Sequence, residues 1–398
     1  MRVASDTLRN VFLNALEVAQ RRIVDTQQQV STGRRVNTPS DDPVAAARIA
    51  GLDASLKRLD QYRSNATVAR NQLGLEEDSL ATAIDNLQRV SELAVQANTD
   101  TLSNGDRAAI AAELRQRRDA LVGIGNITDA EGKYLFGGYS ESTRPFTGGV
   151  GSAIVYNGDQ GQRTLQITDT RFVAINDSGA RVFQDIPTGN GTFALAAAPA
   201  NTGTGVLGAG TVVNPAAWVR DTYTITFVTP TTYEVRDAAT ALVTSGTYTS
   251  GQSIAFRGVD VPITGSPAAG DKFTVAPSGK RDVFATLDSL IAALETPAAG
   301  GAAQAQLHNK VGQLLADVDK ATGHVIDARS EIGSRVRALD DEASLGEDFS
   351  AQLTQTLSDL RDLDYAEALS RLSQQMFGLD AAQKAYAQTQ NLSLFRYL

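Results

Sequence analysis

Few side chains in this 398-residue chain could carry chemistry, and their spacing is unfavourable for it. His308 and His324 are the only two histidines. They are sixteen residues apart, which does not suit two metal ligands on one helical face. Cysteine is absent, so disulfides, thiolate ligands and a cysteine nucleophile are excluded. We expect both histidines to be ordinary surface or hydrogen-bonded side chains.

Neighbouring carboxylates occur in two runs, EED at 76–78 and DDE at 340–342. Such a pair could serve as general acid and base, but both runs fall in long helical patterns, and we interpret them as solvated faces. The chain has no GxSxG, HExxH, P-loop or dinucleotide-binding pattern, and FGGYS at 136–140 is interpreted as a tight turn. We therefore predict no enzyme activity, no metal and no cofactor.

The densest cluster of turn-forming and charged residues is STGRRVNTPSDDPVAAARIA, residues 31–50. Gly33 fits the C′ position that follows a helix, where a left-handed backbone is common. Arg34 and Arg35 suit the negative end of that helix. These residue types predict that a helix stops here under tight local control.

The second half of the cluster predicts the start of another helix. Pro39 disfavours helical backbone in the residue before it, and Ser40 is a good N-cap. Asp41 and Asp42 would lie in the first turn, where the helix dipole is positive, and Pro43 costs no hydrogen bond there. The carboxylates therefore need no catalytic explanation, and the segment is interpreted as a joint between two helices.

Apolar residues repeat with helical spacing on both sides of this joint. Those that share one face are Leu8, Phe12, Leu16, Ala19, Ile23, Val30, Ile49, Leu52, Leu56, Leu59, Ala66, Leu73, Leu80, Ile84, Leu87 and Ala94. A spacing of three and four residues held over this length predicts coiled-coil packing. TLSNGD at 101–106 breaks the pattern, and a further helix is predicted from Asp106 to about Gly123.

The C-terminal end repeats the pattern without proline after Pro297. Its apolar residues are Leu345, Phe349, Leu353, Leu357, Leu360, Leu363, Leu369, Leu372, Met376, Leu379 and Tyr386. We predict one uninterrupted amphipathic helix over about the last 50 residues.

Each terminal arm has one apolar stripe and no third element nearby to cover it. Ordering a residue costs about 1–2 kcal/mol, whereas a buried Leu returns about 1.5–3 kcal/mol and occurs only once per helical turn. We therefore expect residues 1–40 and about 365–398 to be disordered in the soluble monomer and to become helical only on assembly. The predicted assembly residues are Leu8, Phe12, Leu16, Ile23, Val30, Leu369, Leu372, Met376, Leu379, Tyr386 and Phe395.

The centre of the chain reads as β structure. Of the 34 glycines, 18 lie between 148 and 279. TYTITFV at 222–228 alternates apolar residues with threonines, and YEVRD at 233–237 continues the pattern after a turn. Residues 187–217 are rich in Gly, Ala, Thr and Pro and are interpreted as a loose connection. The pattern leaves open whether one β domain or two are present.

Composition sets further bounds. A net charge of −9 gives no electrostatic case for nucleic acid or an anionic membrane. No run of 18 apolar residues occurs, so we expect no membrane insertion, and the first 20 residues lack the apolar stretch of a cleaved secretory signal.

These patterns predict an α+β fold with a long antiparallel helical-bundle or coiled-coil core from both termini and an inserted outer β-rich domain. The expected divisions are an N-terminal assembly helix and loop (1–42), the two halves of the helical core (43–146 and 281–364), the outer β-rich region (147–280) and a C-terminal assembly helix (365–398).

The joint segment resembles the N-terminal signature of the bacterial flagellins and their junction relatives. Residues 102–146, LSNGDRAAIAAELRQRRDALVGIGNITDAEGKYLFGGYSESTRPF, are similar to the core segment that follows in that family. The ending LDYAEALSRLSQQMFGLDAAQKAYAQTQNLSLFRYL completes the match. GKYLFGGYSESTRPF and LSLFRYL are more similar to the junction branch, whose members join the flagellar hook to the filament.

This resemblance implies a structural adaptor that is exported by the flagellar type III apparatus to the extracellular flagellum without a cleaved signal peptide. It implies several partners: further copies of the chain in a helical ring, the other hook–filament junction protein, flagellin, and an export chaperone on the C-terminal arm. Filament flagellin is the alternative within the family, and a surface- or glycan-binding module built on the β region is the alternative of a different class.

Overall fold

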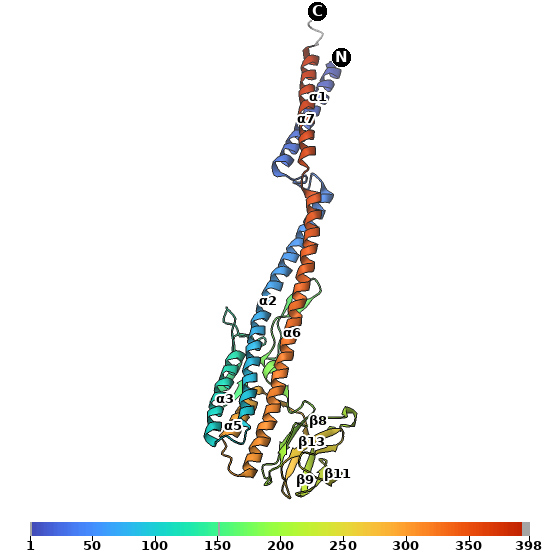
Figure 1. The fold of residues 1–398 in the computed structure, drawn as a ribbon. Coiled ribbons are helices and arrows are strands. Elements are labelled where there is room, and N and C mark those ends of the chain that lie inside the picture. Colours follow the sequence, from blue (N-terminus) through green and yellow to red (C-terminus); the bar gives the residue numbers. More distant parts are fainter. Residues whose placement is uncertain (1, 150–151, 392–398) are drawn as a thin grey trace, which may run out of the picture. The chain divides into compact units, whose positions relative to one another are not determined.

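The computed structural model describes residues 2–149 and 152–391, with the side chains of 2–6, 8 and 389–391 excepted. The chain divides into two compact units, and we treat each by itself (Figure 1). The first unit combines Met1–Ser64 with Asp341–Leu398, and the second is Asn65–Asp340. The first unit therefore combines the two ends of the chain, whereas the second is one continuous stretch.

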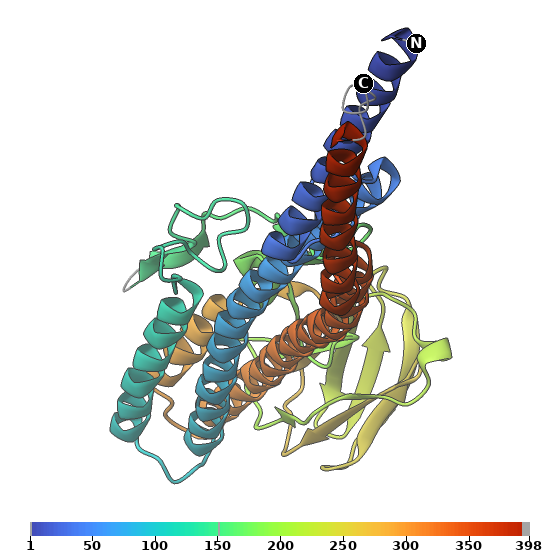
Figure 2. The same cartoon turned by 90° about the horizontal axis from the view of Figure 1, so that it is seen from above.

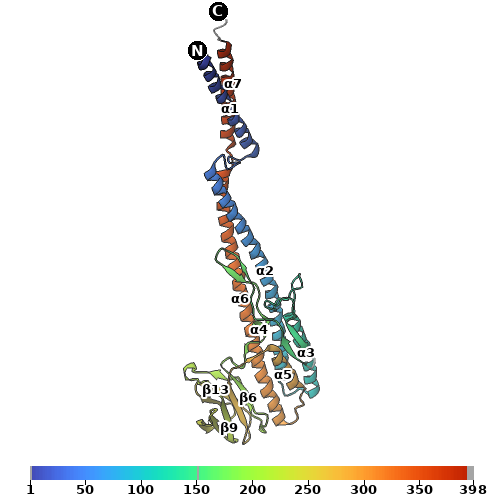
Figure 3. The ribbon, with the colours of Figure 1, turned by 180° about the vertical axis from the view of Figure 1, so that it is seen from behind.

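The first unit is helical. Helix α1 (Arg2–Thr32) lies beside α7 (Tyr365–Asn391), and the two run antiparallel (Figures 1 and 3). The first turns of α2 (Pro43–Ala97) and the last turns of α6 (Gly301–Arg361) complete it. The prediction of one uninterrupted C-terminal helix was wrong, because α6 ends at Arg361 and α7 begins at Tyr365.

The second unit has a helical core made by α2, α3 (Asn104–Gly125), α5 (Val283–Glu295) and α6. Helix α3 confirms the helix predicted after the TLSNGD break, and its N-terminus is fixed by a reciprocal bond pair between Ser103 and Asp106. On α2, Leu73, Leu80 and Leu87 are fully buried in this core, as their heptad spacing predicts.

Short strands from the start of the predicted β region join this helical core. Strand β1 (Phe146–Gly149) pairs with β2 (Ser152–Tyr156), and β3 (Thr164–Gln166) pairs with β4 (Phe172–Ala174). The one-and-a-half-turn helix α4 (Gly179–Phe183) follows. Phe146 and Phe183 pack edge to face at 5.6 Å between ring centroids, and Phe146 also lies 5.0 Å from Phe284 of α5. This aromatic cluster ties residues 146–186 to the helices.

The rest of the β region has its own hydrophobic core. One sheet has five strands in the order β11 (Leu242–Thr247), β10 (Thr232–Arg236), β9 (Tyr223–Thr229), β14 (Lys272–Pro277) and β6 (Phe193–Ala197). The other contains β12 (Ser253–Phe256), β13 (Val259–Thr264), β7 (Val206–Leu207) and β8 (Thr211–Val212). The predicted alternation on β9 is confirmed, because Tyr223, Ile225 and Phe227 are all buried.

We call residues 188–279 the β module. Its two ends meet, because the amide of Thr188 donates to Gly279 O at 3.0 Å beside the pair of β5 (Ile186–Pro187) and β15 (Lys280–Arg281). The sequence could not separate one β domain from two. The structure assigns 146–186 to the helical core and 193–275 to a core of their own.

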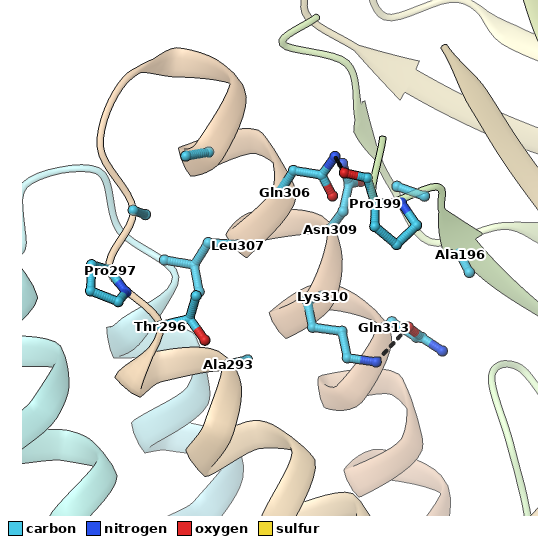
Figure 4. A pocket seen from close by; sticks show the side chains of 13 residues that line it. Ala196, Pro199, Ala293, Thr296, Pro297, Gln306, Leu307, Asn309, Lys310 and Gln313 are labelled. Atoms are coloured by element: carbon cyan, nitrogen blue, oxygen red, sulfur yellow. Dashed lines mark hydrogen bonds between the residues drawn. The ribbon is translucent and has the colours of Figure 1, made fainter. Parts of the chain in front are cut away.

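The β module lies beside α6 (Figure 2), and polar side chains of that helix hold it. Gln306 Nε2 donates to the carbonyl of Pro199, and Asn309 both accepts from Leu207 N at 2.7 Å and donates to Gly205 O at 2.8 Å. Asp317 accepts from Gly189 N at 2.7 Å. Figure 4 shows Gln306 and Asn309 beside the strand that carries Ala196. These bonds satisfy backbone groups that no strand pairs, which fixes the module to the helix.

Candidate assembly site

The contact between α1 and α7 brings several of the predicted assembly residues together. Phe12 and Tyr386 stack with ring centroids 5.1 Å apart and planes at 22°. Ile23 is buried, whereas Leu16 and Val30 on α1 are half-buried. The stripe predicted on α1 therefore faces α7 over most of its length.

The stripe predicted on α7 is covered less well. Leu372 and Leu379 are half-buried, but Leu369 and Met376 are 51% and 53% exposed. The side chain of Leu8 and the whole of Phe395 lie outside the described residues. Two helices alone thus leave part of the apolar surface of the arm open to solvent.

Sequence reasoning missed three residues of this pair. Thr26 is buried, and its hydroxyl donates to Gln375 Oε1 at 2.9 Å. This polar pair interrupts the apolar seam and was invisible to a search for apolar periodicity. Phe377 is 77% exposed, although aromatic side chains normally bury large areas. It adjoins Met376 and extends the open apolar surface.

The joint between α1 and α2 begins as the sequence predicts. Gly33 follows the last residue of α1 with φ at +68°, a conformation that disfavours any residue with a Cβ. A Cβ at this position would also lie 2.8 Å from the hydroxyl of Tyr365. Two separate requirements therefore favour glycine here: the positive φ of the backbone and the lack of space for a Cβ beside Tyr365.

The far end of the joint differs from the prediction. Asp42, and not Ser40, caps α2, since its carboxylate accepts from Ala45 N at 2.9 Å and Pro43 is the first helical residue. Asp41 instead fixes the loop by accepting from the amides of Asn37 and Thr38 at 2.9 and 2.8 Å. The amide of Thr38 and then that of Asn37 lower the pKa of Asp41. The pKa of Asp42 is lowered by the Ala45 amide first and by Arg35 next.

The remaining residues of the joint contact the break between α6 and α7, which the sequence did not reveal. The Arg35 amide donates to Arg361 O at 2.7 Å, and the Leu363 amide donates to Gly33 O at 3.0 Å. The Arg35 guanidinium donates to Leu360 O at 2.7 Å and lies 3.5 Å from Asp42. Arg35 thus serves the negative end of α6, not of α1 as predicted.

We call residues 33–43 with 360–365 the clasp. Arg34 and Asp362 form an isolated antiparallel bridge within it, and both Pro39 and Ser40 are exposed at its loop. Two interruptions, one from each end of the chain, therefore satisfy each other's backbone groups. The clasp is therefore positioned by backbone hydrogen bonds between the two segments.

The two histidines have ordinary partners. His308 lies within 2.7 Å of both Asn98 Oδ1 and Asp100 Oδ1, and His324 lies 2.7 Å from Arg181 O. The described residues contain no group of three or more His, Asp or Glu placed to hold a metal. Among the helices that the structure describes, none combines the length and hydropathy of a membrane span.

The acidic run at 76–78 is not the solvated face that the sequence suggested. Glu76 is 1% exposed and accepts from the amide of Asp177 at 3.0 Å. Asp177 is itself held by Arg335, with contacts of 2.9 and 3.1 Å. Burial, and then the charge of Asp177, raises the pKa of Glu76 well above its usual value. Because the cluster lies in the core of the second unit, it stabilises packing between α2, α6 and the segment before α4.

The pocket in Figure 4 likewise has a structural explanation. It has a volume of about 540 Å³ and lies between α5, α6 and the β module (Figure 4). Ala196, Pro199, Ala293 and Pro297 line much of it, and Gln306 and Asn309 in its wall are already hydrogen-bonded. It is the space left where a sheet edge meets two helices.

Two family profiles match the sequence at its ends. The one described as the bacterial flagellin N-terminal helical region matches residues 3–141. The one described as the bacterial flagellin C-terminal helical region matches residues 315–398. Both profiles cover the paired arms and the clasp, and neither covers the β module.

Several proteins similar to this chain are hook-associated proteins of this family. Flagellar hook-associated protein 3 of Escherichia coli is 26% identical over 397 residues, covering 100% of this chain and 99% of its own length. The crystal structure of FlgL from Xanthomonas campestris is 39% identical, with a TM-score of 0.72 over 77% of this chain and 99% of that one. Flagellar hook-associated protein 3 of Legionella pneumophila is 31% identical, with a TM-score of 0.75 over 78% and 98%. Several flagellins align over only 33–34% of this chain.

Proposed function

The chain belongs to the bacterial flagellin family, in the branch of flagellar hook-associated protein 3, and we propose that it joins the flagellar hook to the filament. It is a structural component of the flagellum. The observation that carries the junction role is the extent of similarity. Hook-associated proteins align along the whole chain, β region included, whereas several flagellins align over only about a third of it.

The paired arms supply the physical means of assembly. Helices α1 and α7 contact each other, yet Leu369, Met376 and Phe377 remain at least half exposed. Apolar surface of this kind is stabilised when another subunit covers it. We propose that further copies of the chain cover it in a ring, so that the arms are fully packed only in the assembled flagellum.

The two edges of such a ring would have different partners. We propose that one edge contacts the other hook–filament junction protein and that the opposite edge contacts flagellin. A cytoplasmic chaperone would cover the apolar surface of α7 before export through the flagellar type III apparatus, which would place the protein in the extracellular flagellum without a cleaved signal peptide. The exposed Met376 and Phe377 are the reason to expect such a cover.

Direct labelling tests this location. The exposed turn between β10 and β11, around Thr240, can carry an epitope without entering either hydrophobic core. Immunoelectron microscopy of intact flagella should show label only in a narrow band between hook and filament. Label along the whole filament would identify the chain as a filament flagellin instead, and the protein would then be abundant, not scarce, in sheared flagella.

A further inference from the structure

One stretch of α6 in the first unit is strongly acidic and contains exposed apolar residues. From Asp341 to Leu360 there are five acidic residues and no Lys or Arg. Asp341, Leu345, Asp348 and Gln352 are spaced by four, three and four residues, which places them on one helical face. All four are exposed. We call them face A, together with Phe349.

Face A is apolar at its centre. Leu345 is 64% exposed and Phe349 is 49% exposed, although the sequence pattern predicted both in a coiled-coil seam. Asp341 and Asp348 are in no ion pair with any residue that the structure describes. Large apolar side chains beside unpaired carboxylates are costly to leave in water and are available to a partner.

The opposite chemistry occurs on α2 in the same unit. Ala47, Gly51, Ala54 and Arg58 have the same spacing of four, three and four residues, and all are exposed. We call them face B, together with their neighbours Val44 and Arg48. The two acidic residues of this stretch, Asp53 and Asp60, lie on other sides of the helix by the same spacing.

Face B is small, open and basic. No atom lies within 4 Å of the place where a Cβ of Gly51 would be, so another chain can approach the helix backbone closely there. Arg48 forms no ion pair within the described residues, and Arg58 contacts only the hydroxyl of Ser55 there.

We propose that face A of one copy binds face B of a second copy. Leu345 and Phe349 would pack over Ala47, Gly51 and Ala54. Asp341 and Asp348 would lie against Arg48 and Arg58. The large apolar side chains of face A match the small residues of face B, and the carboxylates of face A match the arginines of face B. Two copies of the same face would repel each other because their charges are alike.

This pairing suits a ring. Because faces A and B differ, a copy bound through A still offers its own B, and the contact repeats from copy to copy. The inference rests on the proposed function, in which copies of the chain assemble in the flagellum, and it assigns the surface through which they do so.

The absence of cysteine allows a clean cross-linking test. Two full-length variants, Ala47→Cys on face B and Gln352→Cys on face A, are expressed together and separately in a strain lacking the native copy. Purified flagella are treated with a short bismaleimide. We expect a cross-linked dimer of this chain when both variants are present, and only monomer from either variant alone.

The matched control places cysteines on the other sides of the same helices, Asp60→Cys and Thr354→Cys, which are also exposed. These should give no dimer together. A dimer from Ala47→Cys alone, from Gln352→Cys alone or from the control mixture would overturn the proposal, and so would monomer throughout while the protein is present in the flagella. Absence of the unaltered chain from flagella would instead overturn the proposed function.

Charge reversal gives a second readout that does not depend on cross-linker reach. Asp341→Lys with Asp348→Lys, and separately Arg48→Glu with Arg58→Glu, should each lower incorporation into flagella at least about tenfold. Co-expression of the two double variants should restore it, since each then offers the other an attractive pair of faces. Failure of co-expression to restore incorporation of two variants that keep wild-type helicity would overturn the pairing of A with B.

Discussion

At the scale of single residues, the buried carboxyl of Glu76 is the main departure from sequence expectations. A run of three acidic residues on a long helix is normally solvated, and Glu77 fits this, since it pairs with Arg329 at 3.2 Å. Glu76 points into the core because it falls on the same face as Leu73 and Leu80. Its helical position alone would have predicted burial, but the prediction followed its acidic character and placed it in solvent.

The raised pKa of Glu76 predicts how stability changes with pH. Between its unfolded value of about 4.5 and its higher folded value, the folded chain binds more protons, so the free energy of unfolding falls as pH rises. Glu76→Gln keeps an acceptor for the Asp177 amide and removes this ionisation. In chemical denaturation, the free energy of unfolding of the variant should equal that of the wild type near pH 4. From pH 5 upwards it should exceed the wild-type value increasingly.

Two variants sharpen this test. Glu76→Ala also removes the ionisation but leaves the buried Asp177 amide without a partner, so it should be about 1–3 kcal/mol less stable than Glu76→Gln at every pH. Glu77→Gln, on a half-exposed neighbour, should change stability by under about 1 kcal/mol. If the wild type instead becomes more stable than Glu76→Gln as pH rises, then the charges of Arg335 and Arg163 lower the pKa of Glu76 by more than burial raises it.

At the scale of helices and strands, the clasp shows what local patterns can and cannot give. Gly33 and Pro43 were predicted in their observed places because each answers a local backbone requirement. The partner segment at 362–364 was missed because the apolar residues Leu360 and Leu363 continue the helical spacing across the break. Only contacts distant in sequence reveal that the chain turns there.

Arg35 should be the most sensitive side chain of the clasp. Arg35→Ala removes the bond to Leu360 O and the contact with Asp42, at a cost of about 1 kcal/mol given its exposure. Hydrogen exchange at the amides of Arg35 and Leu363 should speed up several-fold. Arg34→Ala, which keeps the backbone bridge to Asp362, is the control and should exchange at nearly the wild-type rate. Equal effects of the two variants would contradict the assigned role of the Arg35 guanidinium.

The exposed part of α7 gives a separate prediction about assembly. Met376→Asp with Phe377→Asp changes two side chains that are 53% and 77% exposed, so thermal unfolding of the free protein should stay within a few degrees of wild type. Incorporation into flagella should be lost, because assembly would then bury two charges. Leu372→Asp is the comparison and should loosen α7 in the free chain as well, because Leu372 is half-buried. Normal incorporation of the Met376–Phe377 variant would contradict the assembly role of this surface.

At the scale of the whole molecule, the fold class could be predicted from the sequence, but the division of its centre could not. Long apolar repeats and the Gly-rich middle indicated helical arms around β structure. The short strands from 146 to 187 resemble those that follow in every local respect. What separates them is the core that each set joins, and the Phe146–Phe183–Phe284 cluster depends on segments over 130 residues apart.

This division predicts which deletion the chain tolerates. Removing 190–277 and closing the gap near Thr188 and Gly279, whose backbones already meet, should leave a soluble protein that still supports filament growth. Asn309 loses its partners Gly205 and Leu207 and becomes accessible to water, whereas Asp317 keeps Gly189, so only a modest loss of thermal stability is expected. Removing 146–186 instead should unfold the second unit, because the aromatic cluster is lost. A soluble 190–277 deletion without filaments would show that the β module takes part in polymer contacts.

The account as a whole depends on the role of the chain as a junction between hook and filament. The most direct measurement is made in its own bacterium, with the gene deleted, by comparing flagellin in the culture medium with filament on the cells. We predict complete hooks, no filaments and flagellin shed into the medium; returning the unaltered gene should restore the filaments and stop the shedding. Filaments of normal length on the deletion strain would contradict the junction role.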